Sequence, residues 1–349
     1  MKKTIISVAV AAAAFGTQVS AVELYNQDGS TFAMGGHVTA AVGASDNTNN
    51  GNTQVQTISP RINFEATQQI SDAVTVDAKG EWQMNMLDGG KETFKTRLGY
   101  IGATHEQLGR IAVGTQWSPF YVVAKVADAP IIFANEFLYD NQYALGTARS
   151  EKMAAYSNTF EFGETSSLYV GAGWQGATTS VLAGTEHSLG NRAQLATVYS
   201  IAGVKMGVAH TTGKIHANGE ANNKDAKSTL ASLSYGSYGN GLYVAGVYGD
   251  NENMNNASTG LISKSKVYEG LLAYALDNSL NLSVNYEEVK DDAENYSTMR
   301  TSALQAEYHF SPSLVGAAGY EFDLRSDDDR AKGQSAKNDQ WKLAVRYYL

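Results

Sequence analysis

The sequence contains no cysteine and only 4 prolines among its 349 residues. Without cysteine the chain can form neither a disulfide framework nor a cysteine-ligated zinc site, and it has no thiol nucleophile. Beyond its N-terminal segment it also lacks any apolar run near the roughly 18 residues that a membrane-spanning helix needs. These absences leave two broad classes, a soluble globular protein or a membrane β-barrel.

Basic residues are also scarce, because 26 Lys and Arg stand against 35 Asp and Glu, for a net charge of −9. Such a chain offers no basic face for phosphates, so we expect no nucleic-acid partner. The six histidines have no metal-ligand spacing, and the dinucleotide-like pattern from Gly171 to Gly176 is not followed by an amphipathic helix. There is no Gly-x-Ser-x-Gly motif either. We therefore expect no cofactor, no bound metal and no enzymatic activity.

Residues 1–21 have the three parts of a secretory signal peptide. Lys2 and Lys3 form a basic start, residues 5–15 are apolar, and Val19-Ser20-Ala21 is a small-residue cleavage site. Cleavage would begin the mature chain at Val22 and make its net charge −11, since the leader carries two lysines and no acid. The sequence thus predicts an exported protein of residues 22–349.

From there to the C-terminus, apolar and polar residues alternate with period two, which predicts strands rather than helices. In the segment that ends at Phe310, for example, Leu304 falls on one face and Gln305 on the other. The segments are roughly 9 to 12 residues long, about what a tilted strand needs to cross a bilayer.

Short and long connections alternate between these segments. The short ones are 70–72, 105–109, 162–164, 202–203, 236–241, 277–279 and 311–313. The longer polar ones are 45–53, 117–149, 212–227, 250–264, 290–297 and 326–338. This layout is typical of an outer-membrane barrel with short periplasmic turns and long extracellular loops. Seven turns predict an all-β fold, a 16-stranded antiparallel transmembrane β-barrel, if both termini lie on the turn side.

A soluble β-sandwich would alternate too, but its apolar face would hold fewer Tyr and Gly. Here the apolar face ends repeatedly in aromatic residues, as interfacial girdles require, while the other face carries Lys, Arg, Glu, Asp and Gln. Charged side chains cannot be buried unpaired in a core, but they can face water. A barrel of this size encloses a lumen, so the pattern predicts a water-filled channel.

Three arginines fall on the inward parity of their strands, namely Arg61, Arg97 and Arg149. On neighbouring strands they would form a positive stripe on one wall, although locally paired arginines would have the same spacing. The residues assigned to the lipid-facing parity of these strands are Ile62, Phe64, Ala66, Leu98, Tyr100, Ala154 and Tyr156.

These segments resemble the trimeric general-diffusion porins of Gram-negative outer membranes. The resemblance is carried by residues 61–70, 95–102, 109–114 and 320–324, by Arg149 with Tyr156, and by the aromatic C-terminal strand. It implies a homotrimer in the outer membrane, whose partners are lipid and the small hydrophilic solutes and ions that diffuse through it. It also implies that the three arginines are the basic side of a pore constriction.

The same resemblance implies that residues 117–148 are a third loop that folds into the lumen and faces the arginines with carboxylates. The family's loop motif is present only as Asn135-Glu-Phe-Leu-Tyr-Asp140, so Glu136 and Asp140 match, and the nearest counterpart of an earlier acid is Asp128. The loop is rich in apolar residues, which could pack on the inner wall or line a narrower channel.

Two other functions remain open beside a mildly cation-preferring diffusion porin. A substrate-specific channel of the oligosaccharide type would line its lumen with aromatic residues. An outer-membrane barrel enzyme is the more distant alternative, since no Ser-His-Asp set is evident.

Overall fold

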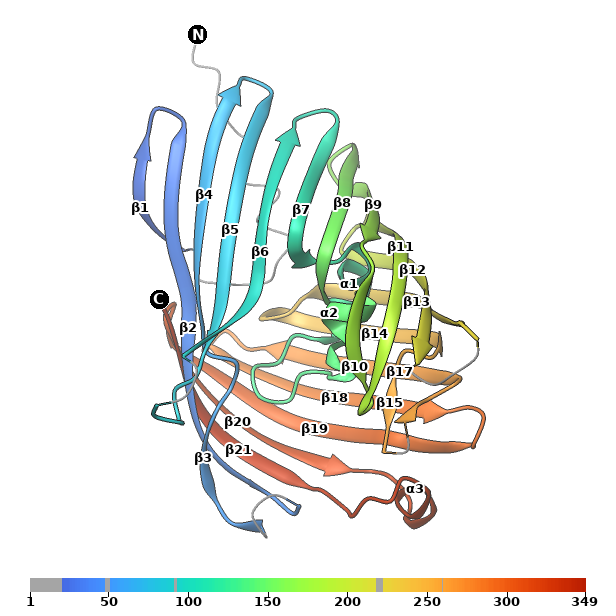
Figure 1. Cartoon of the computed structure of the whole chain (residues 1–349). Coiled ribbons are helices and arrows are strands. Elements are labelled where there is room, and N and C mark those ends of the chain that lie inside the picture. Colours follow the sequence, from blue (N-terminus) through green and yellow to red (C-terminus); the bar gives the residue numbers. More distant parts are fainter. Residues whose placement is uncertain (1–20, 48–50, 91–92, 218–221, 259) are drawn as a thin grey trace.

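The computed structural model describes residues 21–47, 51–90, 93–217, 222–258 and 260–349. The predicted signal peptide therefore lies, apart from Ala21, outside the described residues. Strands dominate the structure (Figure 1). In the first half they are β1 (Val22–Gln27), β2 (Ser30–Ser45), β3 (Gln54–Thr57), β4 (Arg61–Ser71), β5 (Val74–Met84), β6 (Phe94–His105), β7 (Gly109–Trp117), β8 (Arg149–Phe162), β9 (Ser166–Gln175), β10 (Thr178–Leu182) and β11 (Thr185–Ile201). In the second half they are β12 (Val204–Ala217), β13 (Lys224–Ser237), β14 (Asn240–Glu252), β15 (Asn256–Ala257), β16 (Gly260–Leu261), β17 (Ser265–Ala275), β18 (Leu280–Asp291), β19 (Tyr296–Ser311), β20 (Leu314–Asp323) and β21 (Gln340–Tyr348).

The sheet is a closed antiparallel barrel of 16 strands, as the sequence predicted. The closing strand is β2, whose residues His37–Ser45 pair with the C-terminal strand β21. On its other edge β2 pairs with β4 and then with β3, which together occupy one position in the wall. The short β1 forms a hairpin with the start of β2 and lies on the same edge as β21.

The seven predicted turns all occur. Two further tight turns were not predicted, Asp28-Gly29 between β1 and β2 and Ala183-Gly184 between β10 and β11. Two predicted long loops are shorter than expected. Only residues 292–295 separate β18 from β19, while β12 runs to Ala217 and β13 starts at Lys224. The outward residues of these strand ends are polar, such as Lys214, His216 and Lys290, because strands that extend beyond the apolar belt have no lipid to face. The sequence pattern therefore predicted loops there.

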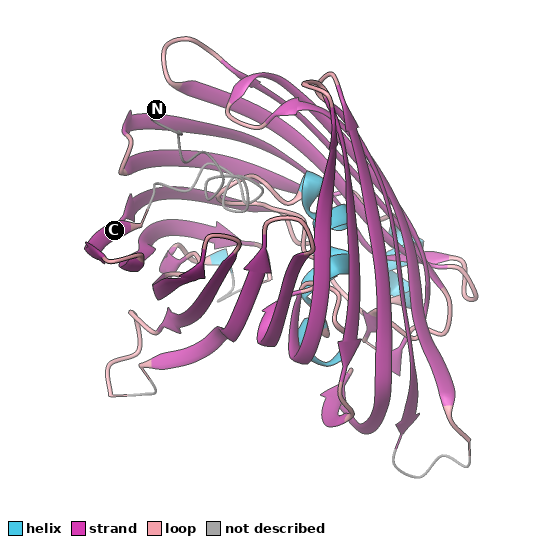
Figure 2. Cartoon of the chain, turned by 90° about the horizontal axis from the view of Figure 1, so that it is seen from above, coloured by secondary structure: helices cyan, strands magenta, loops and turns pink. Residues whose placement is uncertain are grey.

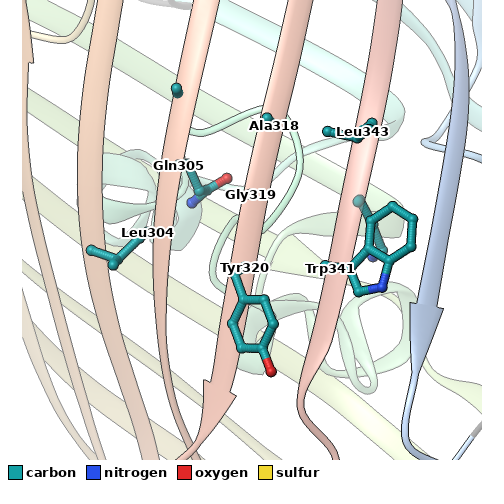
Figure 3. Close-up of a pocket in the computed structure, with 9 residues that line it drawn as sticks. Leu304, Gln305, Ala318, Gly319, Tyr320, Trp341 and Leu343 are labelled. Atoms are coloured by element: carbon teal, nitrogen blue, oxygen red, sulfur yellow. The ribbon is translucent and has the colours of Figure 1, made fainter. Parts of the chain in front are cut away.

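Side-chain exposure follows the predicted alternation over most of the wall. On β19 the outward Leu304 is 55% exposed, whereas its inward neighbour Gln305 is 5% exposed. Figure 3 shows the outer face of β19 to β21, where Leu304, Tyr320 and Trp341 line an apolar hollow. The apolar belt therefore lies outside and the polar faces inside.

On β6 the predicted parity is wrong for Leu98 and Tyr100, which do not face outward. Leu98 is 3% exposed and pairs with Glu81, while Ile101 is 58% exposed. The reason is a register shift, since Thr96 pairs with Trp82 and Leu98 with Glu81, which leaves Arg97 as an extra residue. Such a bulge reverses the parity that follows it, and sequence alternation cannot reveal it.

Residues 118–148, named L3 here, lie inside the barrel and contain four short helices. They are α1 (Pro119–Ala124), η2 (Lys125–Ala127), η3 (Phe137–Tyr139) and α2 (Gln142–Leu145); a further helix, α3 (Asp327–Lys332), lies in the connection between β20 and β21. Figure 2, seen from above, shows helices within the ring of strands. In the described part of the chain, no helix is long and apolar enough to span a membrane.

A charge placed on the outer face tests this topology. We expect Leu304→Arg to destabilise the barrel in a bilayer by roughly 2 to 4 kcal/mol if the residue lies near the midplane, because its guanidinium would enter hydrocarbon. Reversible unfolding from lipid vesicles measures this cost, with Leu304→Met as the apolar control. Equal stability of the Leu304→Arg and Leu304→Met barrels would contradict the assigned outward face.

Candidate functional site inside the barrel

L3 begins and ends with residues suited to tight backbone turns. Ser118 caps α1, since its hydroxyl accepts a hydrogen bond from the Tyr121 N–H at 3.1 Å, and Pro119 follows at the first helical position. Gly146 ends α2 with φ +66°, and a Cβ there would lie 2.4 Å from Gln194 Nε2. Ser118 N–H donates to Ala148 O at 2.9 Å, which closes the base of the loop.

Backbone N–H groups of L3 donate hydrogen bonds to polar side chains on the inner faces of β18 and β19. The Glu287 carboxyl accepts the N–H groups of Glu136 and Phe137 at 2.9 and 2.7 Å. Glu307 accepts the N–H of Ile131 at 2.7 Å, and Gln305 accepts the N–H of Phe133 at 2.9 Å. These inward residues of β18 and β19 therefore supply the acceptors that the loop lacks within itself.

The apolar side chains of L3 pack against the inner wall, which decides between the two positions left open by the sequence. Phe120, Val123 and Leu138 are 0% exposed. They form a cluster with wall residues such as Leu230 and Val267. The two residues of L3 that are exposed, Glu136 and Asp140, are both acidic.

Arg61 and Arg97 lie together on the wall, around one carboxyl group. Arg97 Nε donates to Glu81 Oε1 at 2.6 Å, and Arg61 Nη1 lies 3.8 Å from the same oxygen. Ser59, whose φ is +48°, receives Arg97 Nη1 on its hydroxyl and Arg61 Nε on its carbonyl. The break in the wall strand at Ser59 and Pro60 thus holds both guanidinium groups.

Arg149 is also inward but has different surroundings. Its Nε donates to Gln142 Oε1 at 2.7 Å, and its guanidinium carbon lies 5.3 to 5.6 Å from the ring centres of Trp117, Tyr139 and Tyr143. The residue is 7% exposed. This aromatic cage ties β8 to L3 through cation–π contacts.

A fourth cation of this wall, Arg346 of β21, was not among the site residues predicted from the sequence. Its Nε donates to Thr39 Oγ1 at 2.8 Å, and its charge acts on Arg61 and on His37. Its inward parity was visible in the C-terminal strand. Its nearness to Arg61 was not, because that depends on β21 pairing with β2.

Among the predicted acids of L3, Asp128 is within electrostatic reach of the arginines. Both Arg61 and Arg149 act on its carboxylate, and the hydroxyls of Tyr121, at 2.8 Å, and of Tyr139 donate to it. Burial nevertheless raises the pKa of Asp128 to about 6, since these favourable contacts offset only part of the desolvation. Burial and the neighbouring carboxylate keep the pKa of both tyrosines well above the usual value, so they remain donors.

Glu136 and Asp140 are exposed and lie elsewhere on the loop. The charge of Glu136 acts on Lys342 of β21 and on Glu321 of β20. Asp140 Oδ2 accepts the N–H of Asn256 at 3.3 Å, in the connection between β14 and β17. The described residues contain no group of three or more His, Cys, Asp or Glu arranged to hold a metal ion.

Known proteins are similar to this chain over nearly its whole length. A family model described as Gram-negative porin matches residues 5–349. Outer membrane protein U of Vibrio parahaemolyticus is 27% identical over 99% of each chain, and outer membrane porin protein OmpD of Salmonella typhimurium is 26% identical over 97% of each. Among solved structures, Salmonella typhi OmpF in complex with daunomycin covers 94% of this chain and 100% of its own, with 21% identity and a TM-score of 0.78. An anion-selective porin from Comamonas acidovorans gives a TM-score of 0.71 at 14% identity and covers 92% of this chain and all of its own.

The anchoring of L3 can be tested at Glu287. We expect Glu287→Ala to leave the two loop N–H groups without their acceptor, at a cost of about 1 to 3 kcal/mol for each N–H left unsatisfied. The loop should then exchange its amide hydrogens faster, as measured by mass spectrometry on the protein in detergent. Glu321→Ala is the matched control, because Glu321 accepts from the Gln340 side chain rather than from L3. Equal exchange in both variants would contradict the anchor.

Proposed function

The chain belongs to the Gram-negative porin family, and from this premise we propose how its channel treats solutes of different charge and size. The protein is an outer-membrane porin, and its barrel forms a water-filled channel for the passive diffusion of small hydrophilic solutes.

In this proposal the constriction lies between the arginine wall and L3. Arg61 and Arg97 form its basic side, together with Arg149 at the base of the loop. Asp128 supplies the opposing charge near them, Glu136 extends the acidic side toward Lys342, and Asp140 extends it toward the connection between β14 and β17. Opposed rows of charge produce a transverse field, in which polar solutes align and apolar solutes lose hydration.

We assign a mild cation preference to the channel. The chain without its predicted leader carries a net charge of −11, and the exposed Glu136 and Asp140 stand at the lumen surface of L3. Fixed negative potential at an entrance raises the local concentration of cations. The arginines reduce this preference without reversing it.

General diffusion is favoured over a substrate-specific channel by one observation, the burial of the apolar face of L3 against the wall. A channel for oligosaccharides needs aromatic faces that are free to stack on sugars. Three aromatic residues near the base of L3, Trp117, Tyr139 and Tyr143, already surround Arg149. The family and the named relatives are channels, and we propose no enzymatic activity for this chain.

We further propose a homotrimer, as the resemblance to trimeric porins implies. The outward faces of β2 and β4 carry the small residues Ala40 and Ala66, which let two barrel walls approach closely. Gly36, which lies on the same face, has a separate reason to be glycine. Its φ is +134°, and a Cβ there would lie 2.1 Å from Arg61 O.

Liposome swelling distinguishes general diffusion from substrate specificity. We expect the swelling rate to fall smoothly as neutral sugars grow in size, and not to saturate as the concentration of any one sugar rises. A large oligosaccharide that enters faster than a smaller sugar, with saturation, would favour the specific channel instead. Empty liposomes supply the baseline.

Selectivity should change with pH because of Asp128. Its pKa of about 6 means that the carboxylate gains a proton as the pH falls from 7.5 to 5, and the wall arginines then lose an opposing charge. We therefore expect the reversal potential in a KCl gradient to move toward the anion side over this interval. Asp128→Asn should show the low-pH value throughout and lose most of the pH dependence. An unchanged pH response in Asp128→Asn would contradict this role.

A further inference from the structure

Arg346 occupies the place where the two ends of the barrel wall meet. It lies opposite Thr39 in the pairing of β21 with β2, and its Nε donates to Thr39 Oγ1 at 2.8 Å. Its guanidinium carbon lies 5.9 Å from the ring centre of Tyr348. One edge of the guanidinium is therefore held in place, while the side chain as a whole stays partly exposed on the lumen side.

The terminal nitrogens of Arg346 have no acceptor among the described residues, and no carboxylate of those residues forms an ion pair with it. Arg110 provides the contrast within the same lumen. Both terminal nitrogens of Arg110 donate to Asp77, one of them at 2.7 Å. The N–H groups of Arg346 are thus available to a ligand, whereas those of Arg110 are occupied.

The surroundings of Arg346 carry an excess of positive charge. Arg61 and Arg97 share the single carboxyl of Glu81, and the charges of Arg97 and Arg346 both act on Arg61. His37 lies within reach of all three arginines, is 3% exposed, and its Nε2 has no hydrogen-bond partner in the described structure. Arg346 adds a third positive charge beside two guanidinium groups that share one carboxyl group, and an anion between Arg346 and Arg61 would reduce the repulsion between them.

We propose that Arg346, together with Arg61, forms a binding subsite for small oxyanions on the lumen wall, a role that rests on the proposed diffusion function. A planar guanidinium with free terminal N–H groups matches the oxygen spacing of phosphate and carboxylate groups. Thr39 fixes the orientation of Arg346, and Arg61 supplies a second positive charge. An anionic solute pauses at this subsite as it crosses, whereas a neutral solute does not.

Block of single-channel current by inorganic phosphate tests the subsite. The protein is reconstituted in a planar bilayer in KCl at pH 7.5, and phosphate is added at constant ionic strength. We expect phosphate to reduce the chloride current in a saturable manner in the unmodified protein. Its apparent Kd should rise roughly tenfold in Arg346→Gln, since one charge-assisted contact is lost.

Arg110→Gln is the matched control, because it removes the same unit of charge from the lumen but no free N–H group. Its apparent Kd for phosphate should stay close to that of the unmodified protein. Arg346→Lys should bind with intermediate strength, since it keeps the charge but loses the planar fork. If Arg346→Gln does not assemble, Thr39→Ala can replace it. This variant keeps the charge of Arg346 but removes the hydroxyl that orients its guanidinium, so the apparent Kd for phosphate should rise severalfold.

Equal phosphate block in Arg346→Gln and the unmodified protein would overturn the subsite, and so would an equal loss of block in Arg110→Gln and Arg346→Gln. A conducting channel that phosphate never blocks would also overturn it while leaving the diffusion function intact. A correctly folded protein that conducts no ions would instead count against the proposed function itself.

Discussion

Lipid supplies no hydrogen-bond partner for a backbone N–H or C=O, so a sheet that crosses a bilayer must close on itself. In this protein the closure depends on β2, which pairs with β21 along one edge and with β3 and β4 along the other. Every other feature follows from that closure. It separates an outer face that contacts lipid from an inner face that contacts water, and it brings residues from the two ends of the chain into one wall.

Closure also creates an interior that must hold L3. The loop is too short and irregular to satisfy its own backbone groups, so they depend on side chains of the wall. Glu287, Gln305 and Glu307 point inward because of the strand alternation, and they accept N–H groups from the loop. The same parity that keeps apolar residues outside therefore also supplies the contacts that hold the loop across the lumen.

Charge is unevenly distributed around that lumen. The wall built from β2, β4, β6 and β21 holds Arg61, Arg97 and Arg346, whereas L3 carries Asp128 and Glu136. Local irregularities of the backbone set this arrangement as much as the regular strands do. The break at Ser59 and the extra residue Arg97 bring two guanidinium groups to one carboxyl group, an arrangement that ideal strands in perfect register would not produce.

Sequence alone determined the features that depend on local chemistry. The period of two, the turn residues and the aromatic ends of the apolar face predicted a 16-stranded barrel, because each strand must present one face to lipid and the other to water. The inward position of Arg61 followed from the same alternation. Bulges and strand partners could not be predicted from the sequence, since they arise from backbone register between segments distant in sequence. That is why the parity of Leu98 was wrong and why Arg346 was missed, although it lies beside Thr39 at a separation of 307 residues. Only the closed barrel decided which cations share a wall and which face of L3 is buried, because both depend on what stands across the lumen.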